Sequence, residues 1–361
     1  MRVAFDATSL TSPAGGVRRY ARELFGALAR HEAVEVIAVA PQAGAVLPPG
    51  VGVRRLPVAA PTNLGRAAIS LPLALTMVDR DVFHAPAYTA PLWGAQPLVL
   101  TIHDAVYARR PEWYPGRIDP VRRWFYRASA RRARRIITDS TFSRNEIVAA
   151  YGIRGERIDV VPLGVSAAFR ADPGVRREPF VLHVGDIHPR RNLSMLLSVI
   201  LDLRRSQPGH QDLRLVLVGT DRGSLAGLQA EAAAAGAPGA LEHVTAATDE
   251  DLMRWYQRAA VLAYPSRYEG FGLPVAEAMA CGTPVIAAQA ASMPEVLDGA
   301  GILIAPDDAR GWREALLTVL GDAAHAGEMT ARGLARAGAL TWERTAERTL
   351  EVYRRVSARE T

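Results

Sequence analysis

The chain contains no lysine, so all 43 of its basic residues are arginines. A Schiff base with pyridoxal phosphate and a Walker-type phosphate loop both need a lysine amine, so these two chemistries are excluded. We attribute the arginine-only composition to a GC-rich genome and expect no nucleic-acid partner. The formal charge of +6 can still attract anionic substrates or a membrane surface, although net charge alone decides neither.

Cysteine is almost absent as well. Cys281 is the single cysteine, so an intrachain disulfide is impossible and a cysteine-based metal site has no further ligands. We expect Cys281 to be a small buried hydrophobic residue.

Long apolar runs are also missing. No stretch approaches 18 uninterrupted apolar residues, and the first ten residues read as a strand rather than a targeting segment. We therefore expect a cytoplasmic protein without a membrane span. The 361 residues, 49% of them apolar, are enough for two globular domains of about 170 to 180 residues each.

Short β-rich apolar runs alternate with helical patterns along the whole chain. Leu98 to His103 is such a run in the first half, and the pattern restarts in the second half with residues 180 to 185. This alternation predicts an α/β protein with parallel sheets, in which ligands bind beyond the carboxyl ends of the strands. The irregular stretch from Ser166 to Pro179 indicates a linker, so we divide the chain into domains 1–170 and 171–340.

The stretch from Tyr264 to Pro284 carries the clearest chemical pattern. Two carboxylates, Glu269 and Glu277, flank a turn made of Gly270, Phe271, Gly272 and Leu273. Proline and glycine signals predict a short helix over residues 274 to 281. Glu277 then lies in or next to its first turn, as a fixed acceptor suited to a vicinal diol such as a ribose. The glycines allow a ligand to approach backbone amides.

Two basic or glycine-rich segments are candidates for binding an anion. Arg190 and Arg191 precede a predicted helix, where the helix dipole disfavours cations unless an anion lies between them and the helix end. Gly15 and Gly16 connect the first strand to a helix and can cradle a phosphate, although a plain connecting loop explains them equally well. His103 ends an apolar strand where a ligand is expected, and a structural role is equally open.

The segment 121–135 combines seven arginines with Trp124, Phe125 and Tyr126. On a helix, Val121, Trp124, Phe125 and Ala128 can share one face. Such a helix can rest on an anionic membrane or collect an anionic acceptor. We favour the alternative, in which the aromatic face packs on the core and the arginines are solvated.

Several of these motifs occur together in one family. The chain resembles the retaining glycosyltransferases of the GT-B fold, specifically glycosyltransferase family 4. The segments that carry the resemblance are EGFGLPVAEAMACGTPV, VGDIHPRRNL, VLTIHD, GGVRRYAREL, IITDSTFSRNEI and IDVVPLGV. The resemblance implies two Rossmann-like domains that face a central cleft, with the helix in 341–361 crossing back to the first domain.

The resemblance also implies roles for the residues. Glu277 would hold the ribose of a nucleotide sugar, and Glu269 with the amides of residues 270 to 273 would contact the transferred sugar. Arg190 and Arg191 would bind the diphosphate, helped by the amide of Gly16. His103 would lie beside the sugar, and like Glu269 would position and stabilise rather than attack. Arg191 stands where the family usually has lysine, and no metal is expected.

The donor and the acceptor stay open at this point. The DAT-x-L opening, the HD-x-x-Y stretch and the PR-[KR]-N-L segment look most like mannosyltransferases of surface-glycan assembly, so GDP-mannose is the first candidate donor. A UDP- or dTDP-sugar is the main alternative, and an epimerase or a non-catalytic nucleotide-sugar-binding protein is a further one. The acceptor is a sugar, a glycan or a lipid-linked molecule. The lipid-linked case would suit peripheral contact of 121–135 with the inner face of the plasma membrane.

Overall fold

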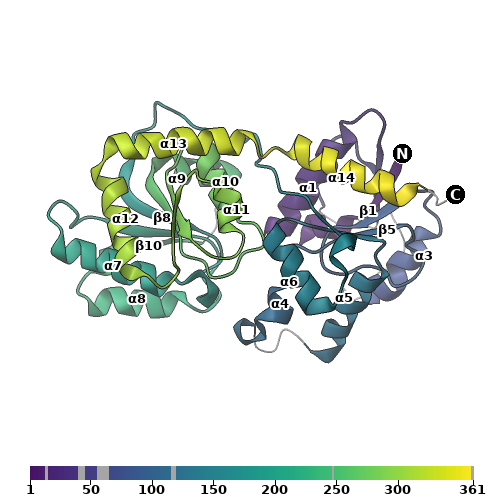
Figure 1. Ribbon diagram of the computed structural model, residues 1–361, viewed down its shortest axis with the longest axis horizontal. Helices are drawn as coiled ribbons and strands as arrows, with labels where there is room; N and C mark the ends of the chain where they lie inside the picture. Colours follow the sequence, from purple (N-terminus) through teal and green to yellow (C-terminus); the bar gives the residue numbers. More distant parts are fainter. Residues whose placement is uncertain (13–14, 40–44, 55–64, 115–118, 246–247, 359–361) are drawn as a thin grey trace. The chain divides into compact units, whose positions relative to one another are not determined.

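A computed structural model shows two compact units, each with its own parallel sheet (Figure 1). The structure describes residues 1–12, 15–39, 45–54, 65–114, 119–245 and 248–358. Unit 1 comprises Met1–Gly164 and Thr341–Thr361, and unit 2 comprises Val165–Leu340. The contacts thus divide the chain at Gly164, whereas the sequence pattern favours a boundary near residue 170.

Unit 1 contains a seven-stranded sheet in the order β3-β2-β1-β4-β5-β6-β7, and all its pairings are parallel. Its strands are β1 (Arg2–Asp6), β2 (Glu35–Val39), β3 (Gly52–Arg54), β4 (Val82–Ala85), β5 (Leu98–Thr101), β6 (Arg135–Thr138) and β7 (Ile158–Val160). The central strands are fully buried, as parallel strands covered by helices on both faces should be.

The helices of unit 1 fill the connections between these strands. They are η1 (Ala7–Thr11), α1 (Gly15–Ala29), η2 (Arg66–Ser70, a π-helical turn), α3 (Leu71–Leu75), α4 (Val106–Arg109), η3 (Pro111–Trp113), α5 (Pro120–Arg132), α6 (Thr141–Tyr151), η4 (Gly155–Arg157) and α14 (Trp342–Ser357). Because α1 begins at Gly15, the two glycines expected in a loop belong to the first turn of the helix.

The C-terminal helix α14 packs on α1 within unit 1, which confirms the expected return of the final helix to the first domain (Figure 1). The hydroxyl of Tyr353 lies 2.5 Å from Nδ1 of His84, and Nε2 of His84 lies 2.7 Å from the hydroxyl of Thr101. That hydroxyl in turn lies 2.8 Å from the hydroxyl of Tyr20 on α1. This buried chain of hydrogen bonds fastens α14 to the sheet.

Unit 2 contains a six-stranded parallel sheet in the order β10-β9-β8-β11-β12-β13. Its strands are β8 (Glu178–Val184), β9 (Arg214–Val218), β10 (Leu241–Val244), β11 (Ala259–Tyr264), β12 (Val285–Ala288) and β13 (Ile302–Ile304). The sequence pattern does not predict β13, because three residues at a sheet edge are too few to show a periodicity. The two sheets confirm the predicted α/β class with two doubly wound domains.

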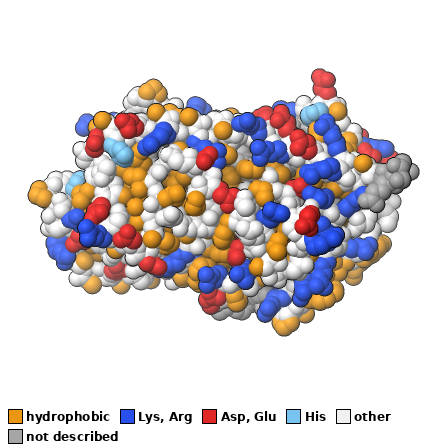
Figure 2. Space-filling model, viewed as in Figure 1, with side chains coloured by type: hydrophobic (Ala, Val, Ile, Leu, Met, Phe, Trp, Pro, Cys, Tyr) orange, Lys and Arg blue, Asp and Glu red, His pale blue; other side chains and the backbone are white. Residues whose placement is uncertain are grey.

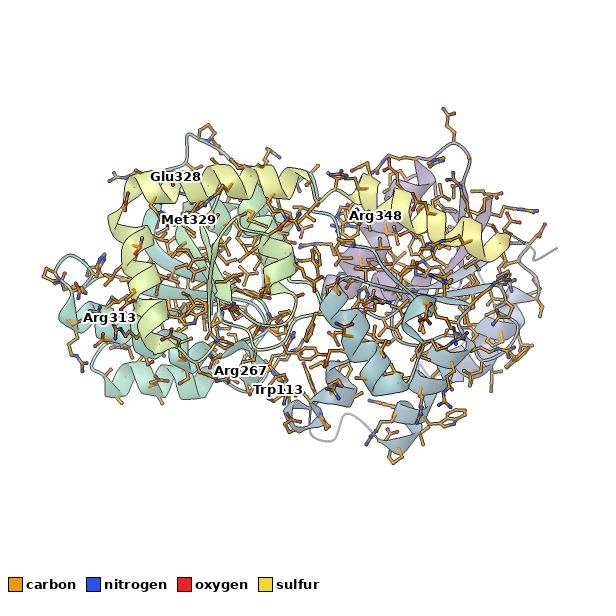
Figure 3. The ribbon with its side chains drawn as sticks, in the orientation of Figure 1. Trp113, Arg267, Arg313, Glu328, Met329 and Arg348 are labelled. Atoms are coloured by element: carbon orange, nitrogen blue, oxygen red, sulfur yellow. The ribbon has the colours of Figure 1, made fainter. Side chains whose placement is uncertain are left out.

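The helices of unit 2 cover both faces of its sheet. They are η5 (Pro189–Arg191), α7 (Leu193–Ser206), α8 (Leu225–Ala234), η6 (Pro238–Ala240), α9 (Asp249–Arg258), α10 (Leu273–Ala280), α11 (Met293–Leu297), α12 (Ala309–Gly321) and α13 (Ala323–Gly338). On α13, Met329 is buried while its neighbour Glu328 is exposed, as expected for an amphipathic helix (Figure 3). Cys281 is buried as expected, and burial raises the pKa of its thiol to about 12.

The structure corrects the predicted packing of α5. Val121 and Trp124 are each 61% exposed, so neither belongs to the buried face. Phe125, Ser129 and Ala130 form that face instead, and Ser129 exchanges hydrogen bonds with the backbone of Ala90. The favoured prediction of a core-facing stripe that includes Trp124 is therefore wrong. None of the helices in the described ranges has the length and apolar character needed to cross a bilayer.

Candidate functional site

The loop between β11 and α10 is held in one shape by its neighbours. The hydroxyl of Ser292 donates to the carbonyl oxygens of Glu269 and Phe271, at 3.0 and 2.7 Å. Gly272 precedes α10 with φ +106°, and a Cβ at this position would overlap Cε of Met293. Only glycine fits such a backbone without strain, so Gly272 and the hydrogen bonds from Ser292 together fix the turn from Glu269 to the helix.

Glu269 lies in a buried cluster with two arginines. Its Oε1 accepts hydrogen bonds from Oγ of Ser266 at 2.6 Å, from Nη1 of Arg190 at 3.1 Å and from Nη1 of Arg191. Among the described residues, no hydrogen bond reaches Oε2. We call Arg190, Arg191, Ser266 and Glu269 the arginine–glutamate cluster. It fixes one carboxylate oxygen with three donors and leaves the other available to a ligand hydroxyl.

Arg191 is 6% exposed and is supported by an aromatic pair. Its Nη1 also bonds the hydroxyl of Tyr264, and its guanidinium lies 5.1 Å from the centre of that ring, which stacks on His183. Burial, together with the charge of Arg191, lowers the pKa of His183 to about 3, so this ring is neutral at physiological pH. Nε of Arg191 is buried and has no partner in the described part of the chain. Gly185 has φ +134°, and a Cβ there would press on the guanidinium.

Arg190 joins η5 to the turn before Glu269. Its Nη1 donates to the carbonyl oxygen of Tyr268 at 2.7 Å, and its own carbonyl oxygen accepts from the amide of Arg267 at 2.9 Å. The sequence pattern suggests an anion between the two arginines and the start of α7. In the structure the anion that both arginines contact is the Glu269 carboxylate.

Glu277 is the fifth residue of α10, directly after the first turn. It is 2% exposed, and its Oε2 accepts a hydrogen bond from the hydroxyl of Tyr256 at 2.9 Å. Tyr256 lies on α9 and is fully buried. The sequence alone gave no sign of this contact, because the two residues lie on different helices and share no motif.

The remaining predicted site residues belong to unit 1. Gly15 and Gly16 are the first two residues of α1, both are exposed, and a Cβ built at either would meet no group beyond the adjacent backbone within 4 Å. The amides of a first helical turn have no intrahelical acceptor, so this end of α1 can donate hydrogen bonds to an anion.

His103 lies two residues beyond the end of β5 and is 9% exposed. Its Nδ1 lies 2.8 Å from Oδ2 of Asp139, and its Nε2 lies 3.1 Å from the carbonyl oxygen of Pro86. A carbonyl oxygen only accepts, so Nε2 carries a hydrogen. Burial alone would lower the pKa of His103, but the charge and hydrogen bond of Asp139, with smaller contributions from Asp104 and the carbonyl of Pro86, outweigh it, so the pKa is raised above its ordinary value. This favours the imidazolium.

The sequence motifs do not single out Asp139, although its position carries a signal. Asp139 directly follows β6 and His103 follows β5, and these two strands pair in the sheet. Polar residues at the carboxyl ends of adjacent parallel strands lie close together, so the pair could have been inferred from the predicted strand order.

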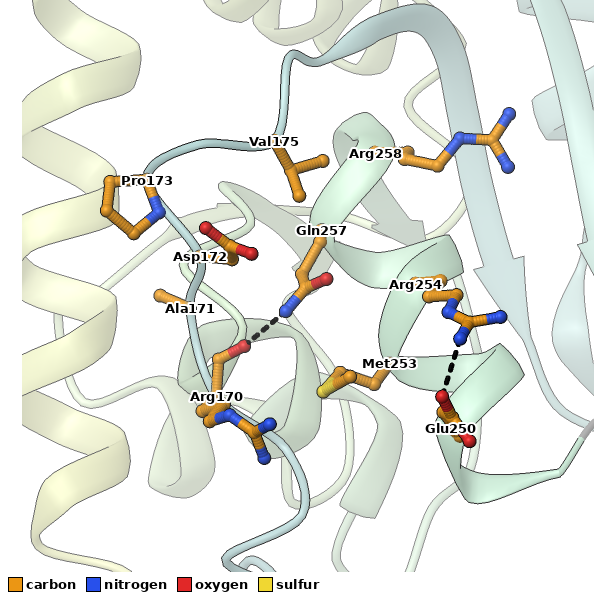
Figure 4. A pocket seen from close by; sticks show the side chains of 10 residues that line it. All are labelled: Arg170, Ala171, Asp172, Pro173, Val175, Glu250, Met253, Arg254, Gln257 and Arg258. Atoms are coloured by element: carbon orange, nitrogen blue, oxygen red, sulfur yellow. Dashed lines mark hydrogen bonds and ion pairs between the residues drawn. The ribbon is translucent and has the colours of Figure 1, made fainter.

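Unit 2 also has a surface hollow that contains none of the predicted site residues. This shallow hollow is lined by residues 170–175 and α9, but Arg254 there is paired with Glu250, and Gln257 donates to the carbonyl oxygen of Arg170 (Figure 4). Within the described ranges, no group of three or more His, Cys, Asp or Glu residues is arranged to hold a metal ion.

Comparison with known proteins gives matches over both units. The sequence model described as "Glycosyltransferase Family 4" matches residues 14–169, and "Glycosyl transferases group 1" matches residues 178–322. The chain is 32% identical to the D-inositol 3-phosphate glycosyltransferase of Kineococcus radiotolerans, over 96% of this chain and 91% of that protein.

Two further proteins are similar over most of the chain. The O-antigen chain mannosyltransferase B of Escherichia coli is 29% identical, over 76% of this chain and 74% of that protein. The structure of Anabaena HepE in complex with UDP-glucose superposes with a TM-score of 0.75 at 19% identity, and the match covers 98% of this chain and 100% of that one. A likeness at this identity shows the fold.

The pair of His103 and Asp139 predicts a pH dependence of stability. The pKa of His103 is raised in the folded state, so protonation of His103 stabilises the fold. This contribution to the free energy of unfolding is fully present below about pH 6.5, the pKa of histidine in the unfolded chain, and is lost as the pH rises through the folded pKa. In Asp139→Asn the buried imidazolium loses its counter-charge, so the pKa of His103 falls below 6.5. Titration of the His103 ring proton by NMR measures this.

The matched control is Asp104→Asn, which removes a nearby carboxylate that has no hydrogen bond to His103. It should shift the pKa of His103 less than Asp139→Asn does. The stability advantage of the wild type over Asp139→Asn should also shrink as the pH rises. An unchanged His103 titration in Asp139→Asn would contradict the imidazolium assignment.

Proposed function

The chain belongs to glycosyltransferase family 4, a family of retaining enzymes that transfer a sugar from a nucleotide sugar, and from this premise we propose that its donor is GDP-mannose. The relative from Escherichia coli is named as a mannosyltransferase, which supports this choice. The HepE structure contains UDP-glucose, so a UDP-sugar is the main competitor, followed by a dTDP-sugar. The acceptor is a sugar, a glycan or a lipid-linked molecule.

One observation carries the proposed site: the buried Arg191 and the partly buried Arg190 share a single oxygen of Glu269. Two guanidinium groups at one carboxylate leave a net positive charge of one in a region with little solvent. A diphosphate brings the additional negative charge that this region lacks, and guanidinium groups suit phosphate oxygens. We therefore assign the diphosphate of the donor to Arg190 and Arg191.

The other assignments are those that the family resemblance implies. Oε2 of Glu269 accepts from a hydroxyl of the transferred sugar, and the amides of Gly270, Phe271, Gly272 and Leu273 surround the same sugar. Glu277, oriented by Tyr256, accepts from the ribose diol. On unit 1, the amides of Gly15 and Gly16 donate to a phosphate oxygen, and His103 supplies positive charge as the imidazolium.

The proposed mechanism rests on the charge that develops as the bond between sugar and phosphate breaks. Negative charge accumulates on the departing diphosphate, and fixed cations stabilise it without having to reorganise. Tyr264 and the carbonyl of Tyr268 hold the two guanidinium groups in place before the donor binds, and Ser266 holds the Glu269 carboxylate. The acceptor hydroxyl attacks from the same face, and the leaving phosphate takes its proton. Glu269 and His103 position and stabilise the reacting groups.

The donor is identified by comparing GDP-mannose, UDP-glucose and dTDP-glucose in thermal unfolding at equal concentration. A ligand at a hundred times its Kd stabilises the folded state by about 2.7 kcal/mol, so the true donor should raise Tm most. We expect GDP-mannose to do so. In Glu277→Gln, which keeps an acceptor oxygen for Tyr256, the affinity should fall about tenfold, because the charge-assisted bonds to the ribose are lost. If none of the three compounds shifts Tm, the proposed site is wrong.

Substitution of Glu269 tests its role in sugar transfer and its role as the counter-charge of Arg191. Glu269→Ala should abolish sugar transfer, and in the absence of donor it should destabilise the fold by about 3 kcal/mol, because Arg191 keeps a buried charge without a partner. GDP-mannose should then restore more stability to Glu269→Ala than it adds to the wild type. Radiolabelled transfer and chemical denaturation measure the two effects. Glu314→Ala, which removes an exposed glutamate paired with Arg310, is the matched control and should change neither. Near-normal turnover of Glu269→Ala would contradict the assignment.

A further inference from the structure

Exposed apolar side chains are concentrated on unit 1. Among the described residues, nine of the ten large hydrophobic side chains that are exposed belong to unit 1, and only Leu334 belongs to unit 2. Five of the nine lie on two segments, η2–α3 with the turn after it and α5, and a sixth, Trp93, lies between β4 and β5. If such exposure were incidental, these residues would be spread over both units. Their concentration on unit 1 therefore indicates an interaction surface.

The first segment presents an apolar stripe to solvent. Ile69, Leu73 and Met77 recur every four residues through η2, α3 and the turn after it, and they are 58%, 45% and 64% exposed. Trp93 is 44% exposed, and its indole N–H donates to the carbonyl oxygen of Ala68 at 2.9 Å. Trp93 therefore lies against the same helical turn and extends the stripe.

The second segment, α5, adds a tryptophan and unpaired positive charge. Its 13 residues include five arginines and no acidic residue. Arg123, Arg127 and Arg131 follow one another at four-residue steps on the solvent side, and none of the three makes an ion pair with another described residue. Like charges at this spacing weakly destabilise a helix, so an external anion bound there would be favourable. The exposed Trp124 lies among these arginines.

The two segments are joined by the chain between them. Ala90 bonds Ser129 of α5, and Gln96 donates to the carbonyl oxygen of Arg132. Gly94, in the same stretch, packs on Pro72 of α3. Hydrophobic and arginine side chains appear together along the edge of unit 1 that carries α3 and α5 (Figure 2). We call this combined surface the α3–α5 face.

We propose that the α3–α5 face docks on an anionic lipid bilayer. Tryptophan and aliphatic side chains enter the boundary between headgroups and acyl chains, and arginines bind lipid phosphates above it. A second copy of the chain is the less suitable occupant, because a two-fold interface would place the arginines of α5 against themselves. The inference is independent of the donor, since vesicle binding needs no nucleotide sugar.

The test is sedimentation of the full chain with vesicles of phosphatidylcholine, with and without phosphatidylglycerol. The wild type should bind the anionic vesicles, and less so at high salt. The variant Arg123→Gln, Arg127→Gln, Arg131→Gln should partition roughly a hundredfold less, at about fivefold for each arginine. The control variant Arg205→Gln, Arg254→Gln, Arg310→Gln removes the same charge from exposed positions of unit 2 and should bind like the wild type.

The apolar part of the face is tested separately. Trp124→Ala should weaken binding at every salt concentration while its salt dependence is unchanged, whereas Leu334→Ala in unit 2 should have no effect. All the substituted side chains are exposed, so none of these variants should be markedly less stable to unfolding than the wild type. The proposal is overturned if the wild type does not sediment with anionic vesicles, or if the triple variant at 123, 127 and 131 binds them as well as the wild type does. It is also overturned if light scattering shows a dimer that Trp124→Ala dissociates.

Discussion

The buried contact of Arg190 and Arg191 with one oxygen of Glu269 is the constraint on which the candidate site depends. A charge removed from water is costly unless another charge and hydrogen bonds compensate it. Here Glu269 supplies that compensation, and the surrounding fold keeps it in place: Ser292 holds the backbone of the turn, and Tyr264 supports the buried guanidinium. The cluster is still one negative charge short of balance. This is why a diphosphate is the ligand that its electrostatics favour.

Unit 1 also contains a buried contact between two titratable side chains, His103 and Asp139. His103 and Asp139 follow two neighbouring strands, and the carboxylate raises the pKa of the imidazole although burial alone would lower it. In both units the charged residues stand in the loops after the strands, because the carboxyl ends of parallel strands meet at one edge where side chains are free of the sheet. The doubly wound fold therefore determines where the chemistry of each unit can lie.

Most of the fold and the central loop of the candidate site could be predicted from the sequence. What could not be predicted are contacts between elements that lie far apart along the chain. Alternating strand and helix patterns predict both sheets, and the glycine turn with its two carboxylates identifies the key loop. Tyr256 and Tyr264 were missed as partners because their contacts cross between elements that share no motif. The face of α5 was predicted wrongly because an amphipathic pattern with arginines nearly all round does not say which side is buried. The structure shows that Ser129, with its hydrogen bonds to Ala90, lies on the buried side.

The central claim is that the arginine–glutamate cluster receives the donor. A crystal structure of the chain with an intact nucleotide sugar tests it most directly. The account predicts diphosphate oxygens within hydrogen-bond distance of Arg190 and Arg191, and a sugar hydroxyl on Oε2 of Glu269 while Oε1 keeps its bond to Ser266. A donor bound elsewhere in unit 2, with the cluster unchanged and both arginines paired only with Glu269, would contradict it.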